Sequence, residues 1–248
     1  MTSSRNFLFY MLALVWVIPS APIWGQEQQA DRPSASEPSP QEWKEYPGAW
    51  LKWHEKFLGE AKGSNAQVVF FGDSLTQGWD SEVWKEKIAP LQALNFGIGG
   101  DRTHHLLYRI RNGELDEIEP KVIVMMIGIN NIWGSYQADE TADGILANVK
   151  AVRELKPKAQ IILIPVLPVN VAKHPDRTWV SQVNQRTLKL VADQENLTVL
   201  DLTSDFLESD GELKQGFYTD DKVHFQKAAY EAMANRLVPV ITELLEHK

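Results

Sequence analysis

The chain has 248 residues and a formal net charge of −8, from 25 lysines and arginines against 33 aspartates and glutamates. This length allows one large domain with a sizeable core, and the acidic balance without any basic stripe argues against a nucleic-acid partner. The sequence contains no cysteine, which excludes disulfides, thiolate metal sites and a cysteine nucleophile. Any covalent catalysis must therefore use another nucleophile.

The first 25 residues have the pattern of a signal peptide. Arg5 gives a positive start, and residues 7–18 form an apolar run that is short for a membrane span. Gly25 offers a small residue at the expected cleavage site. The alternative is an uncleaved N-terminal anchor. Both interpretations place the main body outside the cytosol, so we expect an exported protein, periplasmic or extracellular.

A polar segment rich in proline and serine follows over residues 26–41. This composition predicts a disordered linker, because it offers too little apolar surface for a packed core. No internal repeat and no second linker is found, so we expect one folded domain over residues 42–248.

Within that domain, short apolar runs alternate with helical patterns. The expected strands are residues 67–71, 93–96, 121–127, 160–166 and 197–202. The expected helices are residues 43–62, 102–112, 139–155, 180–195 and 226–246. Continuous apolar runs are typical of strands buried on both faces, as in a parallel sheet. The order predicts an α/β fold, namely a three-layer α/β/α sandwich with a five-stranded parallel, flavodoxin-like sheet. Sites in such folds form at the carboxyl ends of the strands.

A serine follows the first expected strand directly, in the stretch Gly72-Asp73-Ser74-Leu75-Thr76. It lies on a tight strand-to-helix turn, where the positive end of a helix favours developing negative charge. On this stretch alone, capping of the helix is the favoured role for the serine. The threonine at the last position also excludes the G-x-S-x-G elbow of the α/β-hydrolases.

Two further strand ends carry groups that can donate a hydrogen bond to an oxyanion. The second strand ends among closely spaced glycines, where the N–H of Gly100 is a candidate donor and a plain turn is the alternative. The third strand ends in Asn130 and Asn131, and a side-chain amide there is another candidate. Chemistry alone does not separate the two asparagines, and an asparagine-mediated turn is the alternative.

A histidine near the C-terminus has an aspartate three residues before it, as Asp221 and His224. An aspartate at this spacing can hold one ring nitrogen and leave the other as a base. A surface ion pair is the alternative. Asp101 and His104 have the same spacing, but Asp101 directly follows the glycine loop and is expected to cap the next helix. Placement therefore favours the C-terminal pair.

Taken in order, these stretches resemble the SGNH (GDSL) hydrolase superfamily, whose four blocks carry Ser, Gly, Asn and His in that order. The stretches FFGDSLTQGW and LQALNFGIGGDRTHHLLYRIRNGELDEIEPKVIVMMIGINN closely resemble the α-subunit family of platelet-activating factor acetylhydrolase. The resemblance implies that Ser74 is the nucleophile and that Asp221 and His224 complete a triad. It also implies that Ser74, Gly100 and Asn130 donate to the oxyanion.

The resemblance further implies an esterase that cleaves short acyl groups, acetyl above all, through an acyl-enzyme and without any metal or cofactor. Leu75, Ile129 and Val223 each neighbour one of the implied catalytic residues. We expect them to line the acyl pocket, and the alternative is that they point into the core. Ile129 stands where the family usually has threonine, which affects the substrate rather than the catalytic set.

Two other interpretations remain open. A carbohydrate O-acetyl esterase is favoured by the export segment, because the resembling phospholipid hydrolases are intracellular. Aromatic residues in or near the strand-end loops would suit a sugar, namely Trp79, Trp133, Tyr136 and Trp179. A non-catalytic binding module of the same fold is less favoured, because binding needs no complete catalytic set. The expected partner is a small acyl ester, from an acetylated glycan or a lipid, with a homodimer as a possible assembly.

Overall fold

The computed structural model describes residues 32–246, and residues 33–246 belong to one compact unit. The expected signal peptide or anchor, and the start of the expected linker, lie outside the described residues. The centre of the unit is a five-stranded, all-parallel sheet in the order β2-β1-β3-β4-β5. The strands are β1 Val68–Gly72, β2 Ala93–Gly97, β3 Val122–Met126, β4 Gln160–Leu163 and β5 Leu197–Val199. The predicted α/β fold is confirmed.

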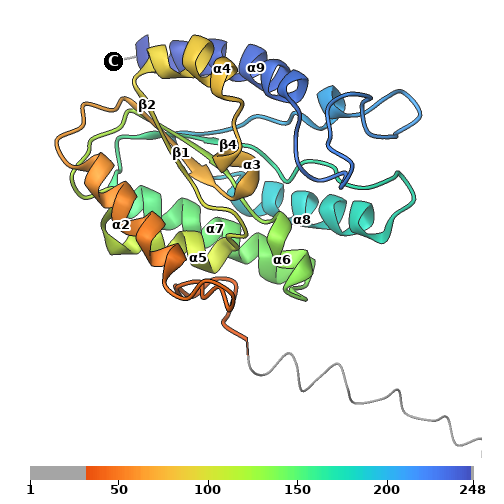
Figure 1. Ribbon diagram of the computed structural model, residues 1–248, viewed down its shortest axis with the longest axis horizontal. Helices are drawn as coiled ribbons and strands as arrows, with labels where there is room; N and C mark the ends of the chain where they lie inside the picture. The colour runs from red at the N-terminus through yellow and green to blue at the C-terminus, as the bar shows by residue number, and fades with distance from the viewer. Residues whose placement is uncertain (1–31, 247–248) are drawn as a thin grey trace, which may run out of the picture. The chain divides into compact units, whose positions relative to one another are not determined.

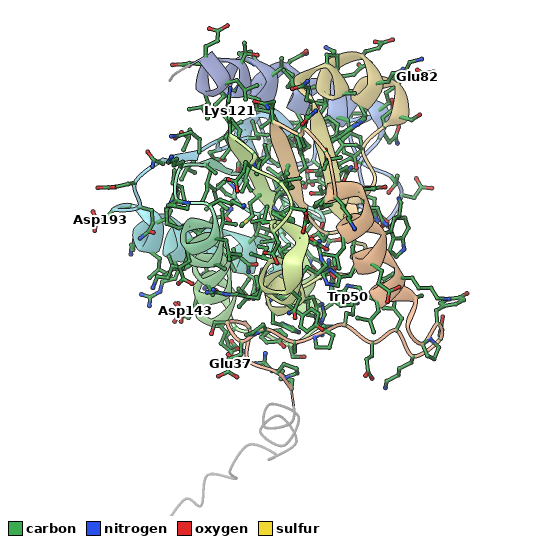
Figure 2. All side chains as sticks on the ribbon, turned by 90° about the vertical axis from the view of Figure 1, so that its left-hand side faces the viewer. Glu37, Trp50, Glu82, Lys121, Asp143 and Asp193 are labelled. Atoms are coloured by element: carbon green, nitrogen blue, oxygen red, sulfur yellow. The ribbon has the colours of Figure 1, made fainter. Side chains whose placement is uncertain are left out.

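Helices cover both faces of this sheet (Figure 1). They are α2 Ala49–Ala61, α3 Ser74–Gln77, α4 Ser81–Val83, α5 Thr103–Arg109, α6 Ile129–Trp133, α7 Ala138–Leu155, α8 Pro175–Val191 and α9 Lys227–Glu246. Helices α4 and α9 pack together on one face, and α2, α5, α7 and α8 form the other layer. Figure 2 accordingly places Glu82 of α4 and Trp50 of α2 on opposite sides of the sheet. Among the described residues, no helix combines the length and apolarity needed to cross a membrane.

The apolar runs form strands because both of their faces are covered. Every residue of β1 and β3 is buried. The three strands β2, β1 and β3 are also in step at their carboxyl ends, since Gly72 pairs with Gly97 on one side and with Met126 on the other. The segments that follow β1, β2 and β3 therefore emerge side by side.

Two glycines allow α3 to pack directly against these strand ends. A Cβ on Gly72 would lie 2.8 Å from the Cβ of Thr76 in α3, and one on Gly97 would lie 2.8 Å from the Cα of Gln77 in the same helix. Neither contact leaves room for a side chain. These glycines therefore hold the short helix against the edge of the sheet.

The element boundaries differ from the predicted ones for identifiable reasons. The first helix begins at Ala49 rather than near residue 43, after Pro47 and a Gly48 with φ of +74°. Such a left-handed backbone interrupts a helix. β4 ends at Leu163, ahead of the prolines at positions 165 and 168, which cannot donate to a ladder.

Residues 33–41, which lie in the expected disordered linker, contact the folded domain. The carbonyl of Ala35 accepts a hydrogen bond of 2.8 Å from the Thr103 hydroxyl, and the carbonyl of Pro33 accepts one of 2.7 Å from the Tyr136 hydroxyl. Ala35 is buried. The composition is that of a disordered segment, but these partners on the folded domain satisfy its backbone. We call residues 33–41 the N-terminal strap.

Candidate active site

The three expected catalytic side chains are linked by hydrogen bonds, although Ser74 and His224 are 150 residues apart in sequence. Ser74 Oγ is 2.9 Å from His224 Nε2. His224 Nδ1 is 2.6 Å from Asp221 Oδ2. Ser74 is partly buried, whereas about half of the surface of each of the other two side chains is exposed. The three groups have the spacing at which a base can take the serine proton while a carboxylate orients it.

The carboxylate of Asp221 is held by further donors. Its Oδ1 accepts hydrogen bonds from the Thr219 hydroxyl at 2.7 Å and from the backbone N–H groups of Val223 and His224, both at 2.9 Å. Desolvation raises the pKa of this carboxyl, but the hydrogen bonds from His224, Thr219 and Val223 outweigh it and hold the pKa well below its ordinary value. Asp221 is therefore ionised at any pH at which the fold would work.

Ser74 is the first residue of α3, where the chain turns sharply off β1. Asp73 caps this helix by accepting a hydrogen bond of 3.0 Å from the Leu75 N–H. The short sequence around Ser74 favours a capping role when it is taken alone. In the structure the cap is Asp73, and the Ser74 hydroxyl is directed to the histidine.

The other two expected oxyanion donors lie after the neighbouring strands, Gly100 in the loop after β2 and Asn130 in the helix α6 after β3. Gly100 has φ of +76°, a backbone conformation that favours glycine. The Asn130 amide donates a hydrogen bond of 3.0 Å to the carbonyl oxygen of Asp101, the residue after Gly100. A primary amide has two N–H donors, so the second N–H can serve a substrate oxygen.

The structure distinguishes the two asparagines that chemistry alone could not. Asn131 is fully buried, its amide oxygen accepts from the Thr103 N–H at 3.1 Å, and its nitrogen donates to the Thr103 hydroxyl at 3.0 Å. Asn131 thus joins α6 to α5. Asn130 is partly exposed, which leaves it as the candidate that can reach a substrate.

The expectation that Asp101 caps the next helix is wrong. Residue 102 takes the cap position, and the Asp101 carboxylate points inward instead. Its Oδ1 accepts a hydrogen bond of 2.7 Å from Trp50, and its Oδ2 one of 2.9 Å from Arg109 Nε. Arg109 also contacts Glu114, and all of these polar groups are buried. Nothing in the local sequence pattern around Arg109 distinguishes it from a surface residue of an amphipathic helix.

The residues expected at the acyl pocket are all buried. Leu75 is 2 %, Ile129 3 % and Val223 8 % exposed. This burial is compatible with pocket walls and with core packing alike. A cavity of about 290 Å³ is lined in part by Thr219 and Lys222, from the loop that carries Asp221, but its lining includes neither Ser74 nor any of the three expected pocket residues.

Most of the aromatic residues considered for sugar binding are not available for it. Trp79 and Tyr136 are buried, and Trp179 is partly buried. Trp133 alone among those four is exposed, at 50 %, and it lies on α6 three residues after Asn130. No group of three or more His, Asp or Glu side chains is placed to hold a metal within residues 32–246.

The parallel sheet has helices on both faces. A serine, a histidine and a carboxylate are joined by hydrogen bonds beside its strand ends, which is the geometry expected of an α/β/α serine hydrolase. The chain belongs to the GDSL-like lipase/acylhydrolase family, whose sequence model matches residues 70–232. It is a carboxylic ester hydrolase by that membership.

Named relatives and solved structures agree with this assignment. The chain is 36 % identical over 213 residues to platelet-activating factor acetylhydrolase IB subunit alpha1 of Rattus norvegicus, covering 85 % of this chain and 90 % of the relative. It is 37 % identical over 200 residues to subunit alpha2 of Gallus gallus, covering 79 % and 85 %. The fold is also similar to that of a GDSL-like lipase from Bacteroides thetaiotaomicron, with a TM-score of 0.64 at 21 % identity, covering 77 % of this chain and 97 % of that one.

Proposed function

We propose that this protein hydrolyses short-chain acyl esters, with acetyl as the preferred acyl group, through a Ser74-His224-Asp221 triad. The observation that carries the proposal is the position of the His224 ring. It has one nitrogen 2.9 Å from the serine oxygen and the other 2.6 Å from the aspartate. A surface ion pair would not need the serine contact.

In the first step, His224 Nε2 takes the hydroxyl proton of Ser74 as Oγ attacks the ester carbonyl carbon. Asp221 keeps the imidazole oriented and stabilises its charged form. The oxyanion receives hydrogen bonds from the N–H groups of Ser74 and Gly100 and from the Asn130 amide. Loss of one such donor typically costs a factor of about 10²–10³ in rate.

In the second step, His224 returns the proton to the departing alcohol, and the acyl group stays on Ser74. Water then attacks the acyl-enzyme with His224 again acting as base, releasing the carboxylic acid and restoring the serine. Every proton moves between groups of this chain, substrate and water.

Two observations support a short acyl group. The relatives at 36 % and 37 % identity are named acetylhydrolases. The apolar residues next to the catalytic positions in sequence, Leu75, Ile129 and Val223, are buried, and pocket walls formed by them would enclose a short chain. We take these together as the basis for preferring acetyl.

A second candidate is an O-acetyl esterase that acts on glycans. One structural feature favours it, the exposed ring of Trp133 on the helix that begins beside Asn130. An exposed indole face can stack on a sugar ring. The half-exposed triad likewise leaves space for a bulky alcohol. We also propose that the protein is exported, because residues 1–25 have the pattern of a signal peptide. An acetylated glycan would suit an exported enzyme.

The substrate test is a two-stage assay of wild type and Trp133→Ala. The first stage measures kcat/KM for 4-nitrophenyl acetate, butyrate and octanoate, and the proposal predicts that acetate is preferred. The second stage compares acetylated xylan with a short-chain acetyl phospholipid. A glycan esterase should lose activity on xylan, but not on nitrophenyl acetate, when Trp133 is removed. Preference for octanoate would contradict the short-acyl proposal, and an unchanged xylan rate would contradict the sugar-binding role.

Export is tested separately by determining the N-terminus of the protein recovered from its native host. Export with cleavage predicts a mature chain beginning near Gln26 in the extracytoplasmic fraction. A chain that keeps residues 1–25 and stays in the soluble cytosol would contradict it.

A further inference from the structure

We infer that Arg109 is a positioning residue for the oxyanion hole, because its buried guanidinium joins the backbone segments that carry all three proposed donors. The inference rests on the proposed function and deepens it. Arg109 is the last residue of α5 and is completely buried.

The first connection runs from Arg109 to the turn that carries the nucleophile. Arg109 Nη2 donates a hydrogen bond of 3.3 Å to the carbonyl oxygen of Gly72. Gly72 is the last residue of β1 and stands two positions before Ser74. The same carbonyl also accepts from the Ile98 N–H at 3.2 Å, so it ties the end of β1 to the start of the glycine loop.

The second connection runs from Arg109 to the glycine loop. Asp101 Oδ2 lies 2.9 Å from Arg109 Nε and 2.8 Å from Arg109 Nη2, which is the two-nitrogen contact that a planar guanidinium makes with a carboxylate oxygen. Asp101 directly follows Gly100, whose peptide orientation is set by its φ of +76°. Fixing the Asp101 side chain therefore fixes the direction of the Gly100 N–H.

The third connection reaches Asn130 through the backbone of the same aspartate. The carbonyl oxygen of Asp101 accepts the 3.0 Å hydrogen bond from the Asn130 amide. If Asp101 moved, the amide would lose the contact that orients its second N–H. One buried cation thus controls the placement of the Ser74 turn, the Gly100 peptide and the Asn130 side chain.

The remaining contacts of the guanidinium anchor it rather than the site. Arg109 Nη1 lies 2.6 Å from Glu114 Oε2, and Glu114 Oε1 in turn lies 2.9 Å from His54 Nδ1. The guanidinium is therefore also held through Nη1, the nitrogen that contacts neither Gly72 nor Asp101. A lysine keeps the positive charge, but a single ammonium cannot make the planar contact to Asp101 and also reach Glu114 and Gly72.

The experiment compares Arg109→Lys with wild type by kcat per titrated site. A 4-nitrophenyl phosphonate that modifies Ser74 counts functional sites by the nitrophenol released. Dividing the turnover of 4-nitrophenyl acetate by that count removes the effect of any unfolded fraction. We expect Arg109→Lys to lower kcat per site by about 10- to 100-fold with KM changed less than about threefold. The rate constant for phosphonylation should fall in parallel, because the phosphoryl oxygen occupies the same hole.

The chain offers a matched control in Arg153. This arginine also clamps backbone carbonyls, with Nη1 2.8 Å from the oxygen of Ala159 and Nη2 2.7 Å from that of Glu195. These carbonyls lie just before the amino ends of β4 and β5, whereas the candidate site lies at the carboxyl ends of the strands. Arg153→Lys should lower the Tm but leave kcat per titrated site unchanged.

If Arg109→Lys does not fold, the nearly isosteric Asp101→Asn decides the matter, since its amide is uncharged and its single acceptor oxygen cannot accept from both Trp50 and Arg109. Wild-type kcat per site in the folded variant, or a loss of equal size in Arg153→Lys, would overturn the inference. Failure of the proposed function looks different: wild type itself would not turn over the ester, or Ser74→Ala would retain activity.

Discussion

Asp73 stands beside the nucleophile as a fully buried carboxylate. Burial raises the pKa of Asp73 to about 7, and the nearby Asp101 adds to the effect. The folded state then binds this proton more tightly than the unfolded chain, whose aspartates titrate near pH ~3.9. The contribution of Asp73 to stability therefore decreases as the pH rises from about 4 to about 7 and is constant above that range.

Asp73→Asn should remove this dependence, because asparagine mimics the protonated acid and can still accept from the Leu75 N–H. We expect the Tm of the variant, relative to that of wild type, to be higher near pH ~8 than near pH ~5. Thermal unfolding at both pH values measures the difference. A Tm difference that is the same at both would show that Asp73 does not titrate between them.

Ile129 precedes Asn130 and is buried at 3 % exposure. If it closes the acyl pocket, Ile129→Ala should raise the ratio of butyrate to acetate kcat/KM by about tenfold, since a methylene in such a pocket is worth a factor of about 10–200. The substitution should also destabilise the fold by about 2–5 kcal/mol, as for other buried aliphatic truncations. A lower Tm with an unchanged ratio would place Ile129 in the core instead.

Among elements, the N-terminal strap shows how far composition can mislead. A chain starting at Glu42 would lose the two strap carbonyls to which the hydroxyls of Thr103 and Tyr136 donate. Each hydrogen bond lost typically costs about 0.5–1.5 kcal/mol of stability. We expect this truncated chain to unfold at a lower Tm than one that starts at Gln26. Equal Tm values would restore the disordered linker.

The loop that carries the triad acid and base contains a strained residue. Lys222 has φ of +58°, a backbone conformation that is disfavoured for residues other than glycine. Its carbonyl oxygen accepts a hydrogen bond of 3.0 Å from the Asn170 N–H. Lys222→Gly relieves about 1–2 kcal/mol of strain, against about 1 kcal/mol of added chain entropy in the unfolded state. The expected result is a Tm equal to or slightly above that of wild type, with unchanged kcat.

Lys222→Val provides the opposite test of the same loop. A β-branched side chain at positive φ should lower the Tm clearly, because it cannot adopt this backbone without strain. A valine variant as stable as the glycine variant would show that the backbone at position 222 relaxes freely.

Elements with a strong local signal could be predicted from sequence, and those set by tertiary contacts could not. The runs at β1 and β3 are buried on both faces, so their apolar pattern is complete. The short helices α3 and α6 have too few residues for a periodic pattern, and close packing at glycines holds α3 in place. The helix α8 begins at Pro175, five residues before the apolar pattern that predicted it.

At the scale of the whole molecule, the order of the strand ends predicts where the candidate site lies. Parallel strands bring their carboxyl ends to one edge, which groups Ser74, Gly100 and the two asparagines, and the family resemblance selects Asn130. Side-chain direction across that edge could not be predicted in the same way. Asp101 illustrates this, since its inward contact with Arg109 depends on how α5 packs against the sheet.

The most direct test of the account is to identify the atom that carries the acyl group during turnover. Wild type is mixed with 4-nitrophenyl acetate, quenched in acid within one turnover and digested for peptide mass spectrometry. The account predicts one acetyl group on Ser74, and neither label nor hydrolysis in Ser74→Ala. Hydrolysis by wild type with the acetyl group on another residue, or full activity in Ser74→Ala, would contradict it.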